Sequence, residues 1–199
     1  FRYIIIGLGG SATNDGGMGM AQALGVRFLD SNGRDLPFGG GALNRLHTID
    51  SSGLDKSIYD SRVFIATDVN NPICGENGAS IIYGPQKGAT LEMAKYLDDN
   101  LMHLSEIIHR DIGVRVTEIQ RMGAAGGMAA CLVAFMGAEI ESGVDLVGKV
   151  LGLETQLIGA SLVITAEGQI DHSTKYDKLP VGIARLCKTR GIPIIALTG

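Results

Sequence analysis

Residues 4–17 read IIIGLGGSATNDGG, an apolar β-branched run that leads directly into a glycine-rich loop. The run predicts a buried strand over about residues 3–7. Glycine lets a loop adopt positive φ angles and lets a ligand approach backbone N–H groups closely. The loop also carries two hydroxyls, an amide and a carboxylate, which favours a site for an anion or a polyol over a turn that merely requires glycine. The candidate binding residues are Gly9, Gly10, Ser11, Thr13, Asn14 and Asp15.

Composition sets the broad class of the protein. The 199 residues are 45% hydrophobic, enough to bury a core in one large domain, or in one domain plus part of another. Basic and acidic residues, 17 and 21 in number, are mixed along the chain, so no nucleic-acid partner is expected. No apolar run approaches the ~20 residues that span a bilayer, so no membrane partner is expected either. The three cysteines are odd in number and far apart, which predicts a reduced, cytoplasmic protein without disulfides or a zinc framework.

Hydrophobic periodicity predicts alternating strands and helices along the rest of the chain. The strongest signal is a helix over about 90–112, begun by Thr90 and ended by Gly113. From residue 160 onward, two apolar strands enclose a helix, which is typical of a parallel sheet in an α/β protein. Gly39–Gly41 is expected to be a mobile connection. Further strands are expected at 26–29, 62–67, 81–83, 162–165 and 193–199, and further helices at about 18–24, 42–46, 127–136, 143–152 and 180–190.

Both ends of the chain lie next to regular structure. The first residue is Phe1 rather than Met, and the last seven residues form a strand and the beginning of its loop. A natural chain seldom stops at such a point. We therefore expect a fragment of a longer protein.

Carboxylates follow two other predicted strands. Asp68 and Asn70 come after the strand at 62–67, and Glu167 and Asp171 follow the strand at 162–165. In α/β proteins ligands bind at the carboxyl ends of strands. Carboxylates there suit Mg²⁺ or a general base, although any one of them can instead be a helix cap. We expect Asp68 to be the catalytic base, and Glu167 and Asp171 to share a metal ion.

Two lysines complete a set of residues that suits phosphoryl transfer. Lys87 and Lys178 can offset the charge of phosphate groups. Catalysis of phosphoryl transfer rests on positioning and on charge neutralisation. We expect Lys178 to take this catalytic role.

A dinucleotide-binding motif is the alternative interpretation of the first loop. Residues 7–12 match GxGxxA after a strand, and Asp30 stands near a strand end eighteen residues past Ala12. However, the motif needs a helix that begins within it, so that the pyrophosphate meets the helix N-terminus. Residues 14–17 would break that first turn, and Asp15 would repel the ligand. An NAD(P)-binding oxidoreductase is therefore kept as the alternative function.

Five segments, in order, resemble the glycerate kinases of the glyoxylate and sugar-acid pathways. They are GLGGSATNDGGMGMAQALGVRFLD (7–30), TDVNNPICGENGAS (67–80), YGPQKGAT (83–90), GAAGGM (123–128) and LVITAEGQID (162–171). The resemblance covers essentially the whole chain, and members of that family are about twice as long. It implies ATP- and Mg²⁺-dependent phosphorylation of glycerate, typically to 2-phosphoglycerate. It implies glycerate and a nucleotide as partners, and leaves a homodimer open.

The resemblance also implies two α/β domains, one flavodoxin-like and one inserted. On this basis residues 1–156 are assigned to the inserted α/β domain and 157–199 to part of the flavodoxin-like, parallel-sheet domain. The chain departs from the family pattern at Thr67, Ala166, Gln169 and Asp177, where the family usually has CDV, GEGRID and GKTP motifs. A non-catalytic kinase paralogue is therefore a second alternative. We also expect the 199-residue chain alone to be inactive.

Overall fold

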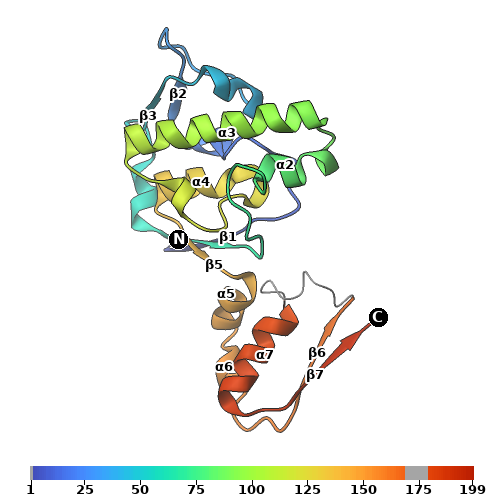
Figure 1. Cartoon of the computed structure of the whole chain (residues 1–199). Coiled ribbons are helices and arrows are strands. Elements are labelled where there is room, and N and C mark those ends of the chain that lie inside the picture. The colour runs from blue at the N-terminus through green and yellow to red at the C-terminus, as the bar shows by residue number, and fades with distance from the viewer. Residues whose placement is uncertain (1, 169–178) are drawn as a thin grey trace. The chain divides into compact units, whose positions relative to one another are not determined.

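A computed structural model describes residues 2–168 and 179–199. The chain forms two compact units, Phe1–Ile140 and Glu141–Gly199 (Figure 1). In the first, the strands are β1 (Tyr3–Gly7), β2 (Arg27–Leu29), β3 (Thr48–Asp50), β4 (Arg62–Ala66) and β5 (Glu139–Glu141, which runs into the second unit). Its α-helices are α1 (Met18–Ala23), α2 (Ala79–Tyr83), α3 (Leu91–Ile112) and α4 (Ala124–Met136). Its 3₁₀ turns are η1 (Gly40–Arg45), η2 (Lys56–Asp60), η3 (Pro85–Lys87) and η4 (Val116–Glu118).

A three-stranded sheet with the order β1-β4-β5 organises the first unit. β1 and β4 are parallel, with Gly7 opposite Ala66, so the loops that follow these two strands leave the sheet at the same edge. Val63 and Ile65 of β4 are buried because alternate residues of a strand point to one face. The mixed α/β class predicted from the sequence is confirmed.

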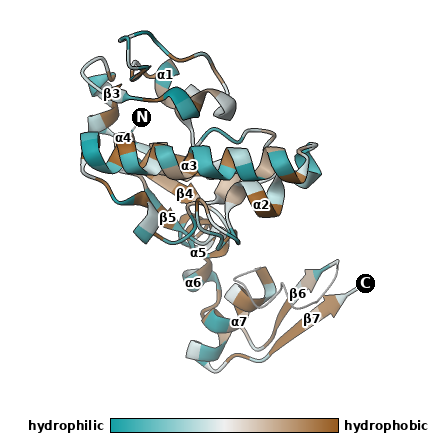
Figure 2. Ribbon diagram, turned by 45° about the horizontal axis from the view of Figure 1, so that its top comes forward, coloured by the Kyte–Doolittle hydropathy of each residue, from teal (hydrophilic) through white to brown (hydrophobic). Residues whose placement is uncertain are grey.

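The long helix α3 packs against the core of this unit. Thr90 accepts a hydrogen bond from the backbone N–H of Met93 (3.2 Å), and Gly113, at φ 86°, ends the helix in the left-handed conformation. Leu101 and Leu104 are fully buried, and Figure 2 shows the alternation of polar and apolar residues along the helix. The predicted helix and both of its end signals are confirmed.

The strand predicted at 81–83 is wrong, because these residues end the helix α2. Their β-branched and aromatic side chains favour a strand locally. However, Ala79 and Ser80, the first two residues of α2, are buried, and the helix packs against α3 and α4. The N–H of Gly84 then donates to the carbonyl of Ser80 (2.8 Å), a helical hydrogen bond. Tertiary packing has overridden the local preference.

The mobile connection predicted at Gly39–Gly41 is wrong. Gly40 begins η1 and lies in close contact with the first loop. Its carbonyl accepts a hydrogen bond from Nδ2 of Asn100 in α3 (2.8 Å). A side chain at Gly40 would collide with the carbonyl of Asn14. Glycine is therefore needed here for close packing.

The second unit contains α5 (Gly143–Val150), α6 (Leu153–Gln156), β6 (Val163–Glu167), α7 (Leu179–Arg190) and β7 (Ile194–Thr198). β6 and β7 are parallel and α7 packs against both, as the strand–helix–strand pattern predicted. Both strands are strongly apolar (Figure 2), and Ile164 and Leu197 are 62% and 57% exposed. Since α5 packs against α7, the predicted domain boundary at 156 falls within this compact unit. The assignment of family domains stays a prediction.

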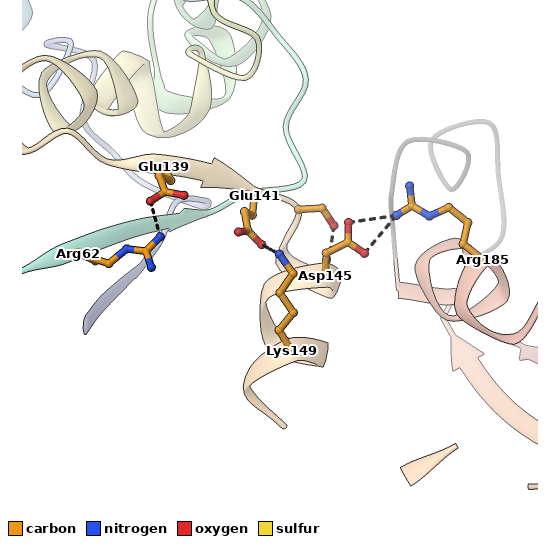
Figure 3. A network of polar contacts seen from close by, with 7 residues as sticks. Arg62, Glu139, Glu141, Asp145, Lys149 and Arg185 are labelled. Atoms are coloured by element: carbon orange, nitrogen blue, oxygen red, sulfur yellow. Dashed lines mark hydrogen bonds and ion pairs between the residues drawn. The ribbon is translucent and has the colours of Figure 1, made fainter. Parts of the chain in front are cut away.

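Ion pairs tie neighbouring elements together within each unit (Figure 3). In the first, Arg62 of β4 pairs with Glu139 of β5 at 2.8 Å. In the second, Lys149 of α5 pairs with Glu141 at 2.7 Å, and Arg185 of α7 lies 3.4 Å from Asp145 of α5. All of these side chains except the half-buried Glu141 are largely solvent-accessible, so each pair contributes only about 0.2–1 kcal/mol.

The three cysteines, Cys74, Cys131 and Cys187, are free thiols and are all buried. Burial raises the pKa of the Cys74 thiol to about 11, with the nearby Asp98 charge adding to the effect. Burial also raises the pKa of Cys131 well above its usual value.

Within the described parts of the chain, none of the helices combines the length and apolar character required to cross a membrane.

Candidate functional site

A small pocket of about 80 Å³ lies where the loops after β1 and β4 meet α4 and η3. Parallel strands place their carboxyl ends at one edge of the sheet, and ligands bind at this edge in α/β proteins. The pocket is lined by Gly9, Gly10, Ser11, Val69, Tyr83, Gln86, Lys87, Ala125 and Gly126. This set contains one lysine and no carboxylate. Three of the predicted binding residues, Gly9, Gly10 and Ser11, are therefore brought together there.

Asp15 does not line the pocket but caps the helix that follows the loop. It is 8% exposed, and its two carboxylate oxygens accept hydrogen bonds from the N–H groups of Gly17 (2.9 Å) and Gly19 (3.0 Å). Such bonds satisfy the free N–H groups of a helix N-terminus. The predicted contact between Asp15 and substrate stays a prediction, and the observed contacts are those of a cap.

The position of this helix argues against the dinucleotide alternative. Residues 8–14 are irregular, and α1 begins only at Met18. Its N-terminus faces the carboxylate of Asp15 instead of an open phosphate site. A pyrophosphate bound at the glycine motif would lack the helix N-terminus on which that mode of binding depends.

The first loop is held in shape by the first turn of α4, which is not helical at residues 125–127. Oγ1 of Thr13 donates to the carbonyl of Ala125 (3.1 Å), and the N–H of Gly16 donates to the carbonyl of Gly126 (3.1 Å). Ala125 and Gly126 both have positive φ, at 51° and 66°. A side chain at Gly126 would collide with the carbonyl of Thr13. Positive φ is costly for alanine, and backbone strain of this kind persists where the surroundings enforce it, often at functional sites.

Two of the other predicted binding residues are also engaged with the protein. Oγ1 of Thr13 is taken up by the bond to Ala125, and Nδ2 of Asn14 donates to Oγ of Ser80 in α2 (2.8 Å). Oδ1 of Asn14 is buried and has no partner among the described residues. Neither residue lines the pocket. Their direct contact with a ligand stays a prediction, and their observed role is to position the loop.

The first loop supplies hydrogen-bond donors without a partner among the described residues, on three residues that line the pocket. Oγ of Ser11 is buried and has no partner in the described part of the chain. The backbone N–H groups of residues 9–11 donate to no other described residue. A side chain added at Gly9 or Gly10 would meet nothing within 4 Å, so the backbone there is open to an incoming group.

Lys87, at the end of η3, also lines the pocket. It is half-buried, and its Nζ donates to the carbonyl of Thr13 at 2.6 Å. Burial lowers the pKa of this lysine because it disfavours the charged form. The sequence placed Lys87 among residues able to offset phosphate charge, but its contact with a loop 74 positions away is visible only in the fold.

The loop after β4 borders the pocket through Val69. Oγ1 of the buried Thr67 accepts a hydrogen bond from the N–H of Val69 (3.2 Å), and Asp68 is exposed between them. Oδ1 of Asn70 accepts a hydrogen bond from Nε of Arg121 (3.0 Å). The fold therefore places Asp68 and Asn70 on a loop next to the pocket.

Two bracing residues of this loop were not predicted from the sequence. Arg121, which bonds Asn70, has a φ of 70°, unusual for a residue with a side chain. The hydroxyl of Tyr83 donates to Oδ1 of Asn71 at 2.7 Å, and the carbonyl of Asn71 accepts from the N–H of Gly123 (2.9 Å). Nothing in the local sequence of Tyr83 or Arg121 indicates these long-range contacts.

Of the two predicted metal ligands, Glu167 is among the described residues and Asp171 is not. Glu167 is half-buried at the end of β6, in the second unit. Asp171 and Lys178, like Gln169 and Asp177, lie outside the described residues. Among the residues the structure describes, no three His, Cys, Asp or Glu side chains gather as a metal site would require. The pocket itself, with hydrogen-bond donors and one lysine, fits an anionic group and not a cation.

The chain is similar throughout to proteins of one kind. The model of the glycerate kinase family matches residues 1–199. The chain is 50% identical to the glycerate 2-kinase of Escherichia coli (strain K12), over 98% of the chain and 51% of that protein. It is 47% identical to the glycerate kinase of Halalkalibacterium halodurans, over 100% of the chain and 52% of the relative.

A solved structure agrees with these relatives. The crystal structure of a candidate glycerate kinase 2 from Salmonella typhimurium LT2 matches the whole chain, with a TM-score of 0.89 and 48% identity. The match covers 53% of that protein. The chain thus spans about half the length of the relatives it matches.

Proposed function

The chain belongs to the glycerate kinase family, and from this premise we propose that the full-length protein phosphorylates glycerate with ATP. The observation that supports this function is the pocket at the carboxyl edge of β1 and β4, where unpaired donors of residues 9–11 meet Lys87. Small hydroxylated acids and phosphoryl groups are the ligands that such donors stabilise. The predicted resemblance to glycerate kinases is confirmed by the comparisons.

The proposed reaction transfers a phosphoryl group to a hydroxyl of glycerate. Gly9, Gly10 and Ser11 hold an oxygen-bearing group of the reactants through N–H and hydroxyl donors. Asp68, on the loop beside the pocket, accepts the proton of the attacking hydroxyl. Holding two reactants in line and neutralising charge supply most of the catalysis in phosphoryl transfer.

ATP and Mg²⁺ are part of the proposal as the phosphoryl donor and its metal. Mg²⁺ favours oxygen ligands and bridges phosphate oxygens in enzymes of this chemistry. Glu167 and Asp171 remain the proposed ligands, and Lys178 remains the proposed neutralising cation. If Glu167 holds the metal, Glu167→Gln in the full-length protein raises the Mg²⁺ concentration needed for activity.

The product tests the proposal most directly. The full-length protein is incubated with glycerate, ATP and Mg²⁺, and the product is followed by proton-coupled phosphorus NMR. A phosphate on C2 couples to one methine proton and gives a doublet, whereas a phosphate on C3 couples to the methylene pair and gives a triplet. We expect the doublet of 2-phosphoglycerate. A triplet would overturn the proposed position, and no ATP-dependent product would overturn the kinase itself.

Experiments on the same full-length protein distinguish the proposed kinase from two alternative functions. A non-catalytic paralogue, suggested by the departures at Ala166, Gln169 and Asp177, would bind reactants without turnover, whereas a kinase turns over at about 1–100 s⁻¹. An NAD(P)-dependent oxidoreductase would bind NAD(H) in calorimetry and show no phosphoryl transfer.

The cytoplasmic location and the division into an inserted domain (1–156) and a flavodoxin-like domain (157–199) belong to the proposal as well.

A further inference from the structure

We propose that Lys87 is the cation of an anion-binding site, and that the pocket at residues 9–11 holds a single carboxylate or phosphoryl group of the reactants. The inference rests on the proposed function, because it names the part of the kinase reactants that this pocket takes. It concerns a residue for which the family match alone specifies no role.

The charge balance of the pocket favours an anion. No Asp or Glu among the described residues forms an ion pair with Lys87. A half-buried ammonium without a counter-ion is unfavourable, which agrees with the lowered pKa of this lysine. Asp15, the carboxylate that follows residues 9–11 in the first loop, caps α1 and does not line the pocket. An anion in the pocket would supply the missing negative charge.

The other polar groups of the pocket act in the same direction. The Ser11 hydroxyl and the N–H groups of residues 9–11 are donors without a partner among the described residues. Of these groups the Ser11 hydroxyl is buried, and a buried donor that is left unpaired destabilises the fold by about 1–3 kcal/mol, whereas Gly9 and Gly10 are exposed and offer their N–H groups to an incoming ligand. Carboxylate and phosphate oxygens accept several such bonds at once, and bonds to a charged acceptor are the stronger kind. A positive ligand or an apolar ligand would leave these donors unpaired.

The position of Lys87 is fixed at both ends of its side chain. Its backbone closes η3, where the N–H of Gly88 donates to the carbonyl of Pro85 (3.0 Å) and Gly88 adopts a φ of 92°. At the other end, Nζ is held by the carbonyl of Thr13 at 2.6 Å. An ammonium has three N–H donors. One bond to Thr13 leaves two for a ligand, without a large change of side-chain conformation.

The size of the pocket limits what it can hold. Pockets for drug-sized ligands measure about 300–1,000 Å³, whereas this one measures about 80 Å³. A nucleotide cannot be enclosed here. One carboxylate with its neighbouring hydroxyl, or one phosphoryl group, is of the right size.

Equilibrium binding to the full-length protein tests the site. Lys87→Gln keeps an N–H that can donate to Thr13 but removes the charge, Lys87→Met removes both, and Lys87→Arg keeps the charge. Lys95→Met, at an exposed lysine of α3, is the matched control. Glycerate and inorganic phosphate are titrated separately by calorimetry, and thermal unfolding of each variant shows that it is folded.

Loss of the charge should weaken binding of one probe by about 10–100-fold, as expected for removal of a hydrogen-bonded charged partner. Lys87→Arg should retain more affinity than Lys87→Gln, and Lys95→Met should bind like the parent. Weaker binding of glycerate alone identifies the carboxylate as the bound group. Weaker binding of phosphate alone, or of both probes, identifies a phosphoryl site.

Two outcomes overturn the proposal. The first is that the folded Lys87→Gln variant binds both probes with the affinity of the parent. The second is that the parent protein binds neither probe. The kinase proposal fails separately. If the parent binds the probes through Lys87 but makes no phosphoglycerate, the anion site exists and the kinase proposal is wrong. If the parent makes phosphoglycerate but Lys87→Gln does not change its affinity for either probe, the kinase proposal stands and the anion site is wrong.

Discussion

Asp15 and Asp68 are both carboxylates that follow strands of the same sheet, yet their surroundings differ. Asp15 is buried, and both of its oxygens accept backbone N–H groups at the start of α1. Asp68 is exposed on a loop beside the pocket. A base that takes a proton from a bound hydroxyl must be reachable by the substrate. Of the two, Asp68 is therefore the better candidate.

Asp68→Asn in the full-length protein should lower kcat by roughly 10²–10⁴ with little change in the KM for glycerate, as loss of a general base does. Steady-state kinetics at saturating ATP measure this. Asp60→Asn, at an exposed carboxylate of η2, is the control and should leave both constants unchanged. A kcat within a few fold of the parent would show that Asp68 is structural.

Asp98 gives a prediction about pH. Burial raises its pKa, Oδ2 accepts a bond from the N–H of Gly75 (2.8 Å), and Oδ1 has no partner among the described residues. A carboxyl whose pKa is higher in the folded state stabilises the fold below its unfolded pKa of about 3.9, and this stabilisation is lost as the pH rises through the folded value. Asp98→Asn should therefore raise the free energy of unfolding at pH 7 and flatten its dependence on pH above about 4.

Urea unfolding of the full-length protein at several pH values measures this effect. Asp60→Asn, at an exposed carboxylate of η2 whose charge does not act on Asp98, is the control and should change neither the stability nor its pH dependence. Lower stability of Asp98→Asn at pH 7 would mean that the charged carboxylate makes a favourable contact that outweighs its burial.

At the level of residues, sequence patterns identified three of the residues that line the candidate site. Gly9, Gly10 and Ser11 were found because glycines and hydroxyls at a strand end have a recognised function in binding. Arg121 and Tyr83 were not found, because their roles depend on contacts with Asn70 and Asn71 that are distant in sequence. Local composition carries no information about such contacts.

Among the elements, the turn that begins α4 is the most sensitive to side-chain size. Gly126, in the non-helical first turn of α4, and Gly137, directly after its last residue, have similar φ angles of 66° and 60°. A side chain at Gly137 meets nothing within 4 Å, whereas one at Gly126 would collide with the Thr13 carbonyl. The two glycines thus separate the effect of backbone conformation from that of close packing.

Gly137→Ala should destabilise the protein by about 1–2 kcal/mol, the cost of a left-handed conformation in a residue with Cβ. Gly126→Ala should destabilise it by more, and should also weaken glycerate binding because the first loop must move. Urea unfolding and calorimetry measure the two effects. Equal losses of stability in the two variants would show that the contact between Gly126 and Thr13 relaxes without consequence.

Elements with many residues and clear ends were predicted well from sequence. α3 has a long apolar periodicity, a capping threonine and a terminal glycine, and each signal is independent of the rest of the fold. α2 has only five residues, and its helical state is decided by packing against α3 and α4. β5, three residues long, was missed because so short a strand is defined only by its neighbour β4.

At the scale of the whole molecule, the pocket belongs entirely to the first unit. A pocket of about 80 Å³ takes one small group, whereas phosphoryl transfer requires two reactants in line. The 199-residue chain by itself should therefore show no measurable phosphorylation of glycerate. A radiometric assay with labelled ATP checks this, with the full-length protein as the positive control. Steady turnover by the chain alone would contradict it.

The burial of all three thiols has a practical consequence for spectroscopy. Maleimides and similar reagents attack the thiolate, and a thiol with a raised pKa forms little of it. Cys74, with a pKa of about 11, and the fully buried Cys131 should therefore resist labelling. A cysteine introduced at the exposed Gln86, on the rim of the pocket, would be the preferred point of attachment in this chain. A fluorophore there would report the filling of the pocket in real time, with the native cysteines left in place.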